Sequence, residues 1–399
     1  MQHQLLFANR VPKLADPTVR DALKFASQPG VISLSGGIPN PELFPLPDVR
    51  QEMNGLLADD NLLQRALQYS PTPGIPELRE TIANMLNAEW GRAITANHIL
   101  ITTGSQQALD LLGKTFLQQG DTVLVEDPTY LAALTAFNAY DPQYLPVELT
   151  NKGLNTKQLA TQLRKPDIKL LYAIPSYQNP TGVSWSAENR AAVLQLIQDN
   201  NCLLIEDDPY GKVCFEAHPA KPISASDDSG HSIYLGTFSK TLFPGLRIGY
   251  IVAERELIET LTLIKQSMDL HSPTLSQLLI WKMLQDQSRY QQHIETITEY
   301  YRGQRDVLLS LLEKHMPANV TWNTPAGGLF IWLTAPGIKS DLLLKKAVDA
   351  GVAFMPGHPF YANQPDMSTI RLTYATATAE QMTTAITALA DVIKKNAVQ

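Results

Sequence analysis

A lysine placed between hydroxyl groups and an arginine is the most chemically informative feature of the sequence. Lys240 follows Thr237 and Ser239, and Arg247 comes after a Pro-Gly turn. A lysine amine forms an imine with an aldehyde, and hydroxyl groups beside a guanidinium bind phosphate. Most lysines are solvated surface charges, so this segment indicates a cofactor site only if other segments supply the remaining parts.

A second phosphate-binding element is predicted where an apolar run meets a helical pattern. Gly104, Ser105 and Gln106 follow the apolar residues 98–103 and open that pattern. The free backbone N–H groups at a helix N-terminus attract phosphate. Simple helix capping explains the same residues and is the more frequent reason for such a junction.

Three further motifs follow apolar runs and carry side chains that suit a flat, charged ring. Tyr130 ends an Asp-Pro-Thr-Tyr sequence and could stack on such a ring, although a tyrosine there is usually packing. Asn179 opens Asn-Pro-Thr-Gly, which turn chemistry alone explains, or it donates to the ligand. One carboxylate among the three acids at 206–208 could hold a ring nitrogen protonated while Tyr210 donates to a phenolate, or this acidic segment is a solvated loop.

Elements that would position these residues are visible as short apolar runs alternating with helical patterns. The pattern predicts a largely parallel α/β sheet with helices on both faces, and ligands bind beyond the carboxyl ends of such strands. A long helical stretch, residues 275–314, leads to a smaller α+β unit with strands at 328–333, 352–355 and 369–374. We expect an N-terminal arm and part of the small domain in residues 1–45, a large domain in 46–290 and the small domain in 291–399.

Composition excludes several classes of protein. The chain has 399 residues, 44% hydrophobic and 18% charged, with a net charge of -7, which argues against nucleic-acid binding. Its two cysteines, Cys202 and Cys214, provide neither a disulfide framework nor a metal site, and Cys202 is expected to be a buried apolar residue. Without a membrane-length apolar run or a signal-like N-terminus, the chain is expected to be cytoplasmic and metal-free.

The ordered motifs resemble those of fold-type I enzymes that use pyridoxal 5'-phosphate (PLP). Over essentially its whole length the chain is similar to class I/II aminotransferases, particularly the 2-aminoadipate and kynurenine aminotransferase group, which is related to the effector domains of MocR-type regulators. Residues 34–45 and 67–78 are typical of that group. The resemblance implies PLP as cofactor, a mostly parallel seven-stranded sheet in the large domain, and a homodimer.

Residue roles follow from the same resemblance. Lys240 would form the imine with the cofactor, and Asp207 would pair with its pyridine nitrogen. Asn179 and Tyr210 would hydrogen-bond the phenolic oxygen, and Tyr130 would stack on the ring. The phosphate would be held by Gly104, Ser105, Gln106, Thr237, Ser239 and Arg247.

Substrate binding and assembly involve residues outside these motifs. By resemblance, Tyr69 would reach the phosphate of the neighbouring subunit, which makes the site composite. Arg371 would grip the substrate α-carboxylate, helped by Asn179, and Gly37 would let the arm approach the substrate. Arg20 is expected either to bind a distal carboxylate or to be an exposed helical arginine.

The expected reaction is amino-group transfer from an L-amino acid to a 2-oxoacid, with 2-oxoglutarate as acceptor, by a ping-pong mechanism. The donor is 2-aminoadipate, an aromatic or branched-chain amino acid, or a glutamate-like one. The alternatives are a PLP-dependent β-lyase or synthase and an effector-binding domain of a regulator. The second alternative is disfavoured because such regulators carry a winged helix before this fold, whereas here the arm motif already begins by residue 35. A serine-acylase interpretation fails because Thr237 stands where the serine should be.

Overall fold

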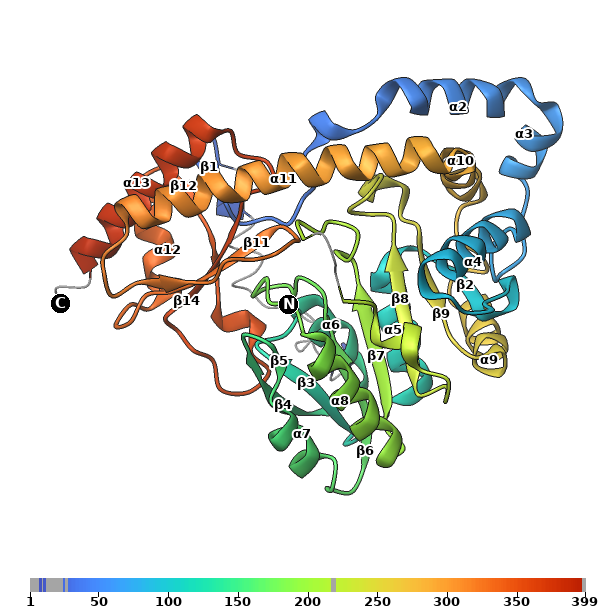
Figure 1. Ribbon diagram of the computed structural model, residues 1–399, viewed down its shortest axis with the longest axis horizontal. Coiled ribbons are helices and arrows are strands. Elements are labelled where there is room, and N and C mark those ends of the chain that lie inside the picture. Colours follow the sequence, from blue (N-terminus) through green and yellow to red (C-terminus); the bar gives the residue numbers. More distant parts are fainter. Residues whose placement is uncertain (1–6, 9, 12–23, 26–27, 217–219, 397–399) are drawn as a thin grey trace.

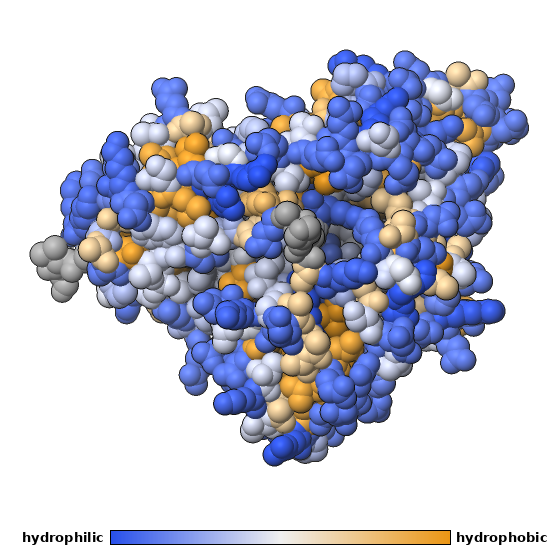
Figure 2. Space-filling view, in the orientation of Figure 1, coloured by the Kyte–Doolittle hydropathy of each residue, from blue (hydrophilic) through white to orange (hydrophobic). Residues whose placement is uncertain are grey.

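The computed structural model describes residues 7–8, 10–11, 24–25, 28–216 and 220–396, and Figure 1 shows their arrangement. A large sheet with flanking helices occupies one part of the molecule, and a smaller sheet with helices occupies the other. On the face shown in Figure 2, hydrophilic residues cover most of the surface and hydrophobic residues gather in small patches. Within the described residues, the structure contains no helix with the length and apolar character needed to cross a membrane.

The large sheet confirms the predicted fold class. Among the described residues it has eight strands in the order β2-β9-β8-β7-β6-β3-β4-β5. They are β2 (Ile99–Thr102), β3 (Thr122–Asp127), β4 (Gln143–Thr150), β5 (Gly153–Leu154), β6 (Ile168–Ala173), β7 (Leu203–Asp208), β8 (Ser232–Thr237) and β9 (Gly249–Val252). Neighbours from β8 to β4 are parallel, whereas β9 is antiparallel to β2 and β8. The strand beyond the expected seven is the two-residue β5, an antiparallel edge addition.

Helices cover both faces of this sheet, and side chains along each strand alternate between the two faces. The covering helices are α5 (Gly104–Phe116), α6 (Leu131–Phe137), α7 (Thr156–Gln162), α8 (Ala187–Asp199) and α9 (Arg255–Gln266). Tyr172 and Ile205 are paired in register and belong to the main core cluster, whereas Leu171 and Leu204 belong to a separate cluster. The same alternation assigns Asp207 to the face of Ile205 and Asp208 to the opposite face.

The helical stretch expected over residues 275–314 is present and is divided into two helices. They are α10 (Thr274–Gln285) and α11 (Gln287–His315). Asp286 between them leaves the helical conformation, with φ -94 and ψ 88, and its side chain caps α11 by accepting from the Arg289 N–H. α10 packs on α2 (Leu46–Ala58), α3 (Asp60–Leu67) and α4 (Pro76–Trp90), while α11 runs across to the smaller sheet (Figure 1).

The smaller sheet is antiparallel, and a separate two-stranded sheet joins the N-terminal arm to the same part of the chain. Its order is β10 (Thr321–Trp322), β11 (Phe330–Thr334), β14 (Thr369–Thr373) and β13 (Met355–Pro356). β1 (Ile32–Ser33) pairs in parallel with β12 (Val352–Ala353), so the strand expected over 352–355 is divided between two sheets. The helices α12 (Ser340–Asp349) and α13 (Ala379–Asn396) complete this unit. The domain limits at residues 45 and 290 remain predictions.

Short 3-10 helices join the longer elements. They are η3 (Pro41–Leu43), η4 (Ala96–His98), η5 (Asn138–Tyr140), η6 (Ile223–Ser226), η7 (Pro244–Leu246) and η8 (His358–Phe360). η7 lies between Lys240 and Arg247 and ends at Arg247, which has a left-handed backbone with φ 55. The turn that the Pro-Gly sequence predicted is therefore a 3-10 helix that reverses the chain from β8 into β9.

Candidate active site

Most of the predicted site residues lie just beyond the carboxyl ends of β2, β3, β6, β7 and β8. Gly104 follows β2, Tyr130 follows β3, Asn179 follows β6, and Lys240 follows β8. Asp207 is the penultimate residue of β7. The parallel pairing of β3, β6, β7 and β8 places these strand ends at one edge of the sheet, as the sequence pattern predicted.

Lys240 contacts the N-terminal arm and lies near two arginines. Its Nζ donates a hydrogen bond to the Gly37 carbonyl oxygen at 2.9 Å. Burial lowers the pKa of the Lys240 amine to about 8, and the positive charges of Arg371 and Arg247 contribute to this shift. A larger fraction of this amine is therefore neutral, and thus nucleophilic, at pH 7 than of an ordinary lysine.

The lowered pKa predicts how fast the apoenzyme binds an aldehyde cofactor at different pH values. Below about pH 8 the neutral Lys240 amine becomes about tenfold rarer with each pH unit, whereas an unperturbed lysine has a pKa of about 10.4. The rate of imine formation, followed by absorbance after mixing with PLP, should rise with pH and level off above about pH 8. N-acetyl-lysine amide is the control, and a rise that continues in parallel with this model amine would contradict the lowered pKa.

Asp207 is a buried carboxylate with one oxygen engaged and one available. It is 1% exposed, and the Tyr172 hydroxyl donates to its Oδ2 at 2.9 Å. Its Oδ1 has no hydrogen-bond partner among the described residues. Burial raises the pKa of Asp207 to about 7, the Tyr172 hydrogen bond opposes this rise, and the Asp208 charge adds to it. A cationic partner at Oδ1 would hold the carboxylate ionised.

The predicted phosphate cradle is assembled by strand pairing. β9 lies between β2 and β8, and Gly249 is in register with both Thr102 and Thr237. The start of α5 is therefore brought beside the Lys240 segment. The Thr237 hydroxyl donates to the Ser239 hydroxyl at 3.0 Å, and the Ser105 hydroxyl is buried without a partner among the described residues. A second donor group, the Arg247 guanidinium, contacts the Thr103 carbonyl oxygen at 3.5 Å.

Gly104 is required in this cradle for two reasons. Its φ is +73, and a Cβ at this position would overlap the Arg247 guanidinium. Gly104→Ala should therefore displace Arg247 and weaken PLP binding by about tenfold or more, because a charge-assisted hydrogen bond contributes about 1.5–3 kcal/mol. Fluorescence titration of the apoenzyme measures this. Gly120→Ala is the matched control, since Gly120 has φ +91 and open space around it; equal affinities in the two variants would contradict the prediction.

Tyr130, Tyr210 and Gln106 differ in how closely they approach the other predicted residues. Tyr210 is 3% exposed and packs edge-on against Phe330, with ring centroids 5.8 Å apart. Tyr130 is partly buried, and the charges of Asp207, Arg371 and Arg247 all influence its pKa, which burial raises. Gln106 is exposed and donates to the Ala132 carbonyl oxygen at 3.2 Å. The two tyrosines thus lie in the site, whereas the Gln106 side chain bridges α5 and α6.

Arg371 reaches the site from β14 of the smaller sheet. Its guanidinium donates to Asn179 Oδ1 at 2.8 Å and to the Ser35 carbonyl oxygen at 2.5 Å, and its Nε has no partner among the described residues. The rings of Phe330 and Phe360 flank it at 4.3 and 5.0 Å. Arg371 is 5% exposed, and no carboxylate of the described chain pairs with it. A buried guanidinium in this condition fits an anionic ligand.

Two predicted residues do not contact the rest of the site among the described residues. Tyr69 is 77% exposed and packs edge-on against His271 at 5.8 Å, which leaves its ring available to another chain. Arg20 lies outside the described residues. Gly37 contacts Lys240 as described, and a Cβ there would come within 2.5 Å of Phe330 Cζ.

Several residues that complete the site were not predicted from the sequence. Ser35, Phe330 and Phe360 hold Arg371, and Tyr172 holds Asp207. Only Tyr172 left a usable signal in the sequence. It is a polar tyrosine inside an apolar strand pattern, and a buried tyrosine hydroxyl normally has a partner.

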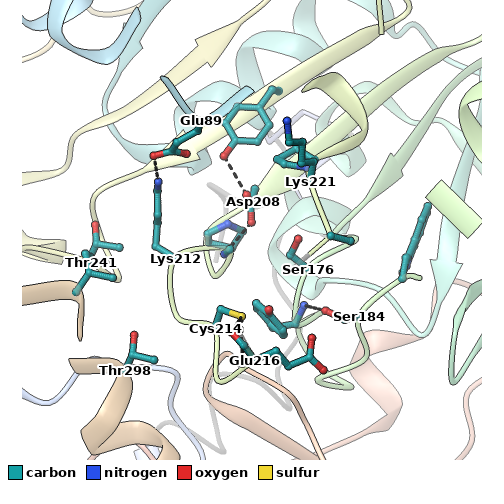
Figure 3. Close-up of a pocket in the computed structure, with 18 of the residues that line it drawn as sticks. Glu89, Ser176, Ser184, Asp208, Lys212, Cys214, Glu216, Lys221, Thr241 and Thr298 are labelled. Atoms are coloured by element: carbon teal, nitrogen blue, oxygen red, sulfur yellow. Dashed lines mark hydrogen bonds and ion pairs between the residues drawn. The ribbon is translucent and has the colours of Figure 1, made fainter. Parts of the chain in front are cut away.

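The opposite face of the sheet carries a separate cleft. Asp208 points into it, next to the ion pair of Lys212 and Glu89 (Figure 3). The Tyr234 hydroxyl donates to Asp208 Oδ2 at 2.9 Å. The consecutive acids Asp207 and Asp208 therefore serve different sides of the sheet, as strand alternation requires.

Known proteins match this chain over nearly its whole length. The model of the family "Aminotransferase class I and II" matches residues 29–389. Aromatic-amino-acid aminotransferase 1 of Thermococcus litoralis is 39% identical, covering 99% of this chain and 95% of its own. The 2-aminoadipate transaminase of Thermus thermophilus is 36% identical over 97% of this chain and 96% of its own length.

Solved structures agree with these sequence matches. The kynurenine aminotransferase of Pyrococcus horikoshii, solved with PMP, has a TM-score of 0.94 and 39% identity, over 98% of each chain. Lys240, the acidic end of β7 and the phosphate cradle all lie within the residues that the family model matches. The chain therefore belongs to the class I and II aminotransferases and is a PLP-dependent transaminase.

Proposed function

We propose that this transaminase moves the amino group of an L-amino acid to a 2-oxoacid, with 2-oxoglutarate as the acceptor, in two half-reactions. The observation that carries the proposal is the position of the Lys240 amine and the buried Arg371 guanidinium in one site with Asp207. The proposed donor is 2-aminoadipate, an aromatic or branched-chain amino acid, or a glutamate-like one. An aromatic-amino-acid and a 2-aminoadipate aminotransferase are among the relatives that support this range.

The available polar atoms of the site fit PLP. We propose that Lys240 binds the cofactor covalently and that Asp207 Oδ1 pairs with its pyridine nitrogen. Asn179 and Tyr210 would bind its phenolic oxygen, and Tyr130 would stack on its ring. The residues assigned to its phosphate are Gly104, Ser105, Gln106, Thr237, Ser239 and Arg247. When bound, PLP supplies an electron-withdrawing ring that stabilises negative charge at the substrate Cα.

Proton transfer and substrate orientation are the tasks of the protein. We propose that the Lys240 amine, once freed by the amino substrate, takes the Cα proton and returns it to the cofactor carbon. Arg371 would bind the α-carboxylate through its two-pronged guanidinium, with Asn179 holding the guanidinium plane. By fixing the carboxylate, Arg371 would set the orientation of the substrate Cα bonds, and cleavage of the C–H bond would be favoured over loss of the carboxylate.

Two groups complete the proposed substrate site. The Gly37 backbone would lie against the bound substrate, because the close approach of Phe330 leaves no space for a side chain at that position. Arg20 would bind a distal carboxylate of the substrate, a role on which the described residues give no geometry. Substrates with acidic side chains should lose affinity in Arg20→Ala, and apolar donors should not.

The proposed assembly is a cytoplasmic homodimer with composite sites. Its support is the 77% exposed Tyr69, which would reach the phosphate bound by the neighbouring subunit. The proposed domains are an arm with part of the small domain to residue 45, a large domain to residue 290 and a small domain beyond it.

A half-reaction tests the proposed function. The holoenzyme is mixed with one amino donor and no oxoacid, and the absorbance of the lysine-bound cofactor and the products are followed. The proposal predicts conversion to the aminated cofactor with one equivalent of oxoacid per site. Release of ammonia with repeated turnover would instead indicate a lyase, and an unchanged spectrum with every donor class would contradict amino-group transfer.

A further inference from the structure

Tyr172 makes a buried contact with Asp207, next to the proposed cofactor site. It lies in β6, is fully buried and donates from its hydroxyl to Asp207 Oδ2 at 2.9 Å. Tyr172 is in register with Ile205 of the neighbouring β7, two positions before Asp207 on the same face of the sheet. Phe137 packs edge-on against its ring, with centroids 5.8 Å apart. The ring is therefore held in place independently of the carboxylate it contacts.

The contact divides the two oxygens of Asp207 between two tasks. No other side chain or N–H of the described residues donates to Asp207, so Tyr172 is its hydrogen-bond donor there. A carboxylate that is bound at one oxygen cannot rotate freely about its Cβ–Cγ bond. The second oxygen, Oδ1, is then held in one orientation with no partner among the described residues.

We propose that Tyr172 is a positioning residue, whose hydroxyl fixes the Asp207 carboxylate as an anion and presents Oδ1 to the pyridine nitrogen of the cofactor. This inference rests on the proposed role of Asp207. Because hydrogen bonding to an anion favours the charged form, Tyr172 keeps the proton of the pair on the nitrogen instead of on the carboxylate.

The surroundings of Asp207 make this hydrogen bond important. Glu126 is a buried acid and Asp208 is a half-buried one, and the charges of both disfavour a further anion, while Asp207 is itself almost completely buried. The other titratable groups that interact with it are Tyr130 and Tyr210. Among the described residues, the Tyr172 hydroxyl is therefore the group that stabilises the Asp207 anion by a direct hydrogen bond.

The molecule provides a matched control for this contact. The Tyr234 hydroxyl donates to Asp208 Oδ2 at 2.9 Å, in a part-buried contact on the opposite face of the sheet. Both pairs join a tyrosine to an acid of β7, so Tyr172→Phe and Tyr234→Phe remove the same kind of bond. Only the first should affect the cofactor ring.

The test is nitrogen-15 NMR of holoenzymes reconstituted with PLP labelled at the pyridine nitrogen. In Tyr172→Phe we expect the ratio of the nitrogen-protonated to the carboxylate-protonated form to fall by about tenfold or more. The reason is that loss of a hydrogen bond to a charged group shifts an equilibrium by about that factor. The nitrogen signal then shifts toward the neutral position. Tyr234→Phe should match the wild type, and kcat should fall in Tyr172→Phe with little change in KM.

The possible outcomes separate this inference from the proposed function. An unchanged nitrogen signal in Tyr172→Phe, with a changed signal in Asp207→Asn, would overturn the role of Tyr172 and leave that of Asp207. An unchanged signal in Asp207→Asn would overturn the role of Asp207 itself. Should Tyr172→Phe not fold, carbon-13 labelling of the tyrosine Cζ in the unaltered chain replaces it. PLP binding should then shift the Tyr172 signal and not that of Tyr234, and equal behaviour of the two would overturn the inference.

Discussion

Replacement of Lys240 by alanine is expected to lower kcat by about 10²–10⁴-fold or more and to remove the absorbance of the lysine-bound cofactor. General acid–base catalysis alone contributes that range, and the variant also loses the covalent attachment. Small amines added to the solution should restore part of the activity, because they can take the Cα proton in place of the missing side chain. Steady-state kinetics and the absorption spectrum of the purified variant measure both effects.

Lys265 provides the control for this experiment. It is a fully buried lysine whose pKa burial lowers, which makes it the described lysine that most resembles Lys240. Its amine, however, is paired with Asp269 at 2.6 Å. Lys265→Met should therefore keep the absorbance of the lysine-bound cofactor, although it should lower stability. A band that persists in Lys240→Ala would contradict the assignment of Lys240.

Arg371→Lys is expected to lower kcat/KM for amino acids by about 10²–10⁴-fold while leaving the spectrum of the bound cofactor unchanged. Lysine keeps the charge but loses the two-pronged geometry that matches a carboxylate. Two charge-assisted hydrogen bonds, each contributing about 1.5–3 kcal/mol, account for this range. The shorter polar group also cannot occupy the space between Phe330 and Phe360 while donating to Asn179.

An amine donor without a carboxylate separates this effect from general damage to the site. The slow half-reaction of such an amine does not need the Arg371 guanidinium, because the amine has no carboxylate to bind. The wild type and Arg371→Lys should therefore convert the amine at similar rates. If the variant lost the same factor with the amine as with the amino acid, Arg371 would not be the carboxylate-binding residue.

The parts of the site that could be predicted are those carried by strand ends. Asp207, Asn179 and Lys240 each follow an apolar run, and parallel strands bring such ends to one edge of the sheet. The acidic run at 206–208 was harder to interpret, because three consecutive acids are also typical of a solvated loop. The structure resolves this by alternation. Asp207 faces the site, and Asp208 faces the opposite cleft.

The parts that could not be predicted depend on contacts between distant segments. The Ser35 carbonyl oxygen binds Arg371, and the Gly37 carbonyl oxygen binds Lys240, because β1 of the arm pairs with β12, which is distant in the sequence. No local pattern in the sequence encodes those contacts. The break at Asp286 was missed for a related reason, since a helical pattern continues on both sides of a residue that is a common helix cap.

Borohydride reduction followed by peptide mapping is the most direct measurement of whether Lys240 carries the cofactor and gives it up during amino-group transfer. In the resting holoenzyme, the mass of the reduced cofactor should be found on the peptide that contains Lys240. When the holoenzyme is treated with an amino donor before reduction, the Lys240 peptide should carry no cofactor mass. When a 2-oxoacid is added after the donor and before reduction, the cofactor mass should return to that peptide. A label on another lysine, or a label on Lys240 that persists after every donor, would contradict the proposed mechanism.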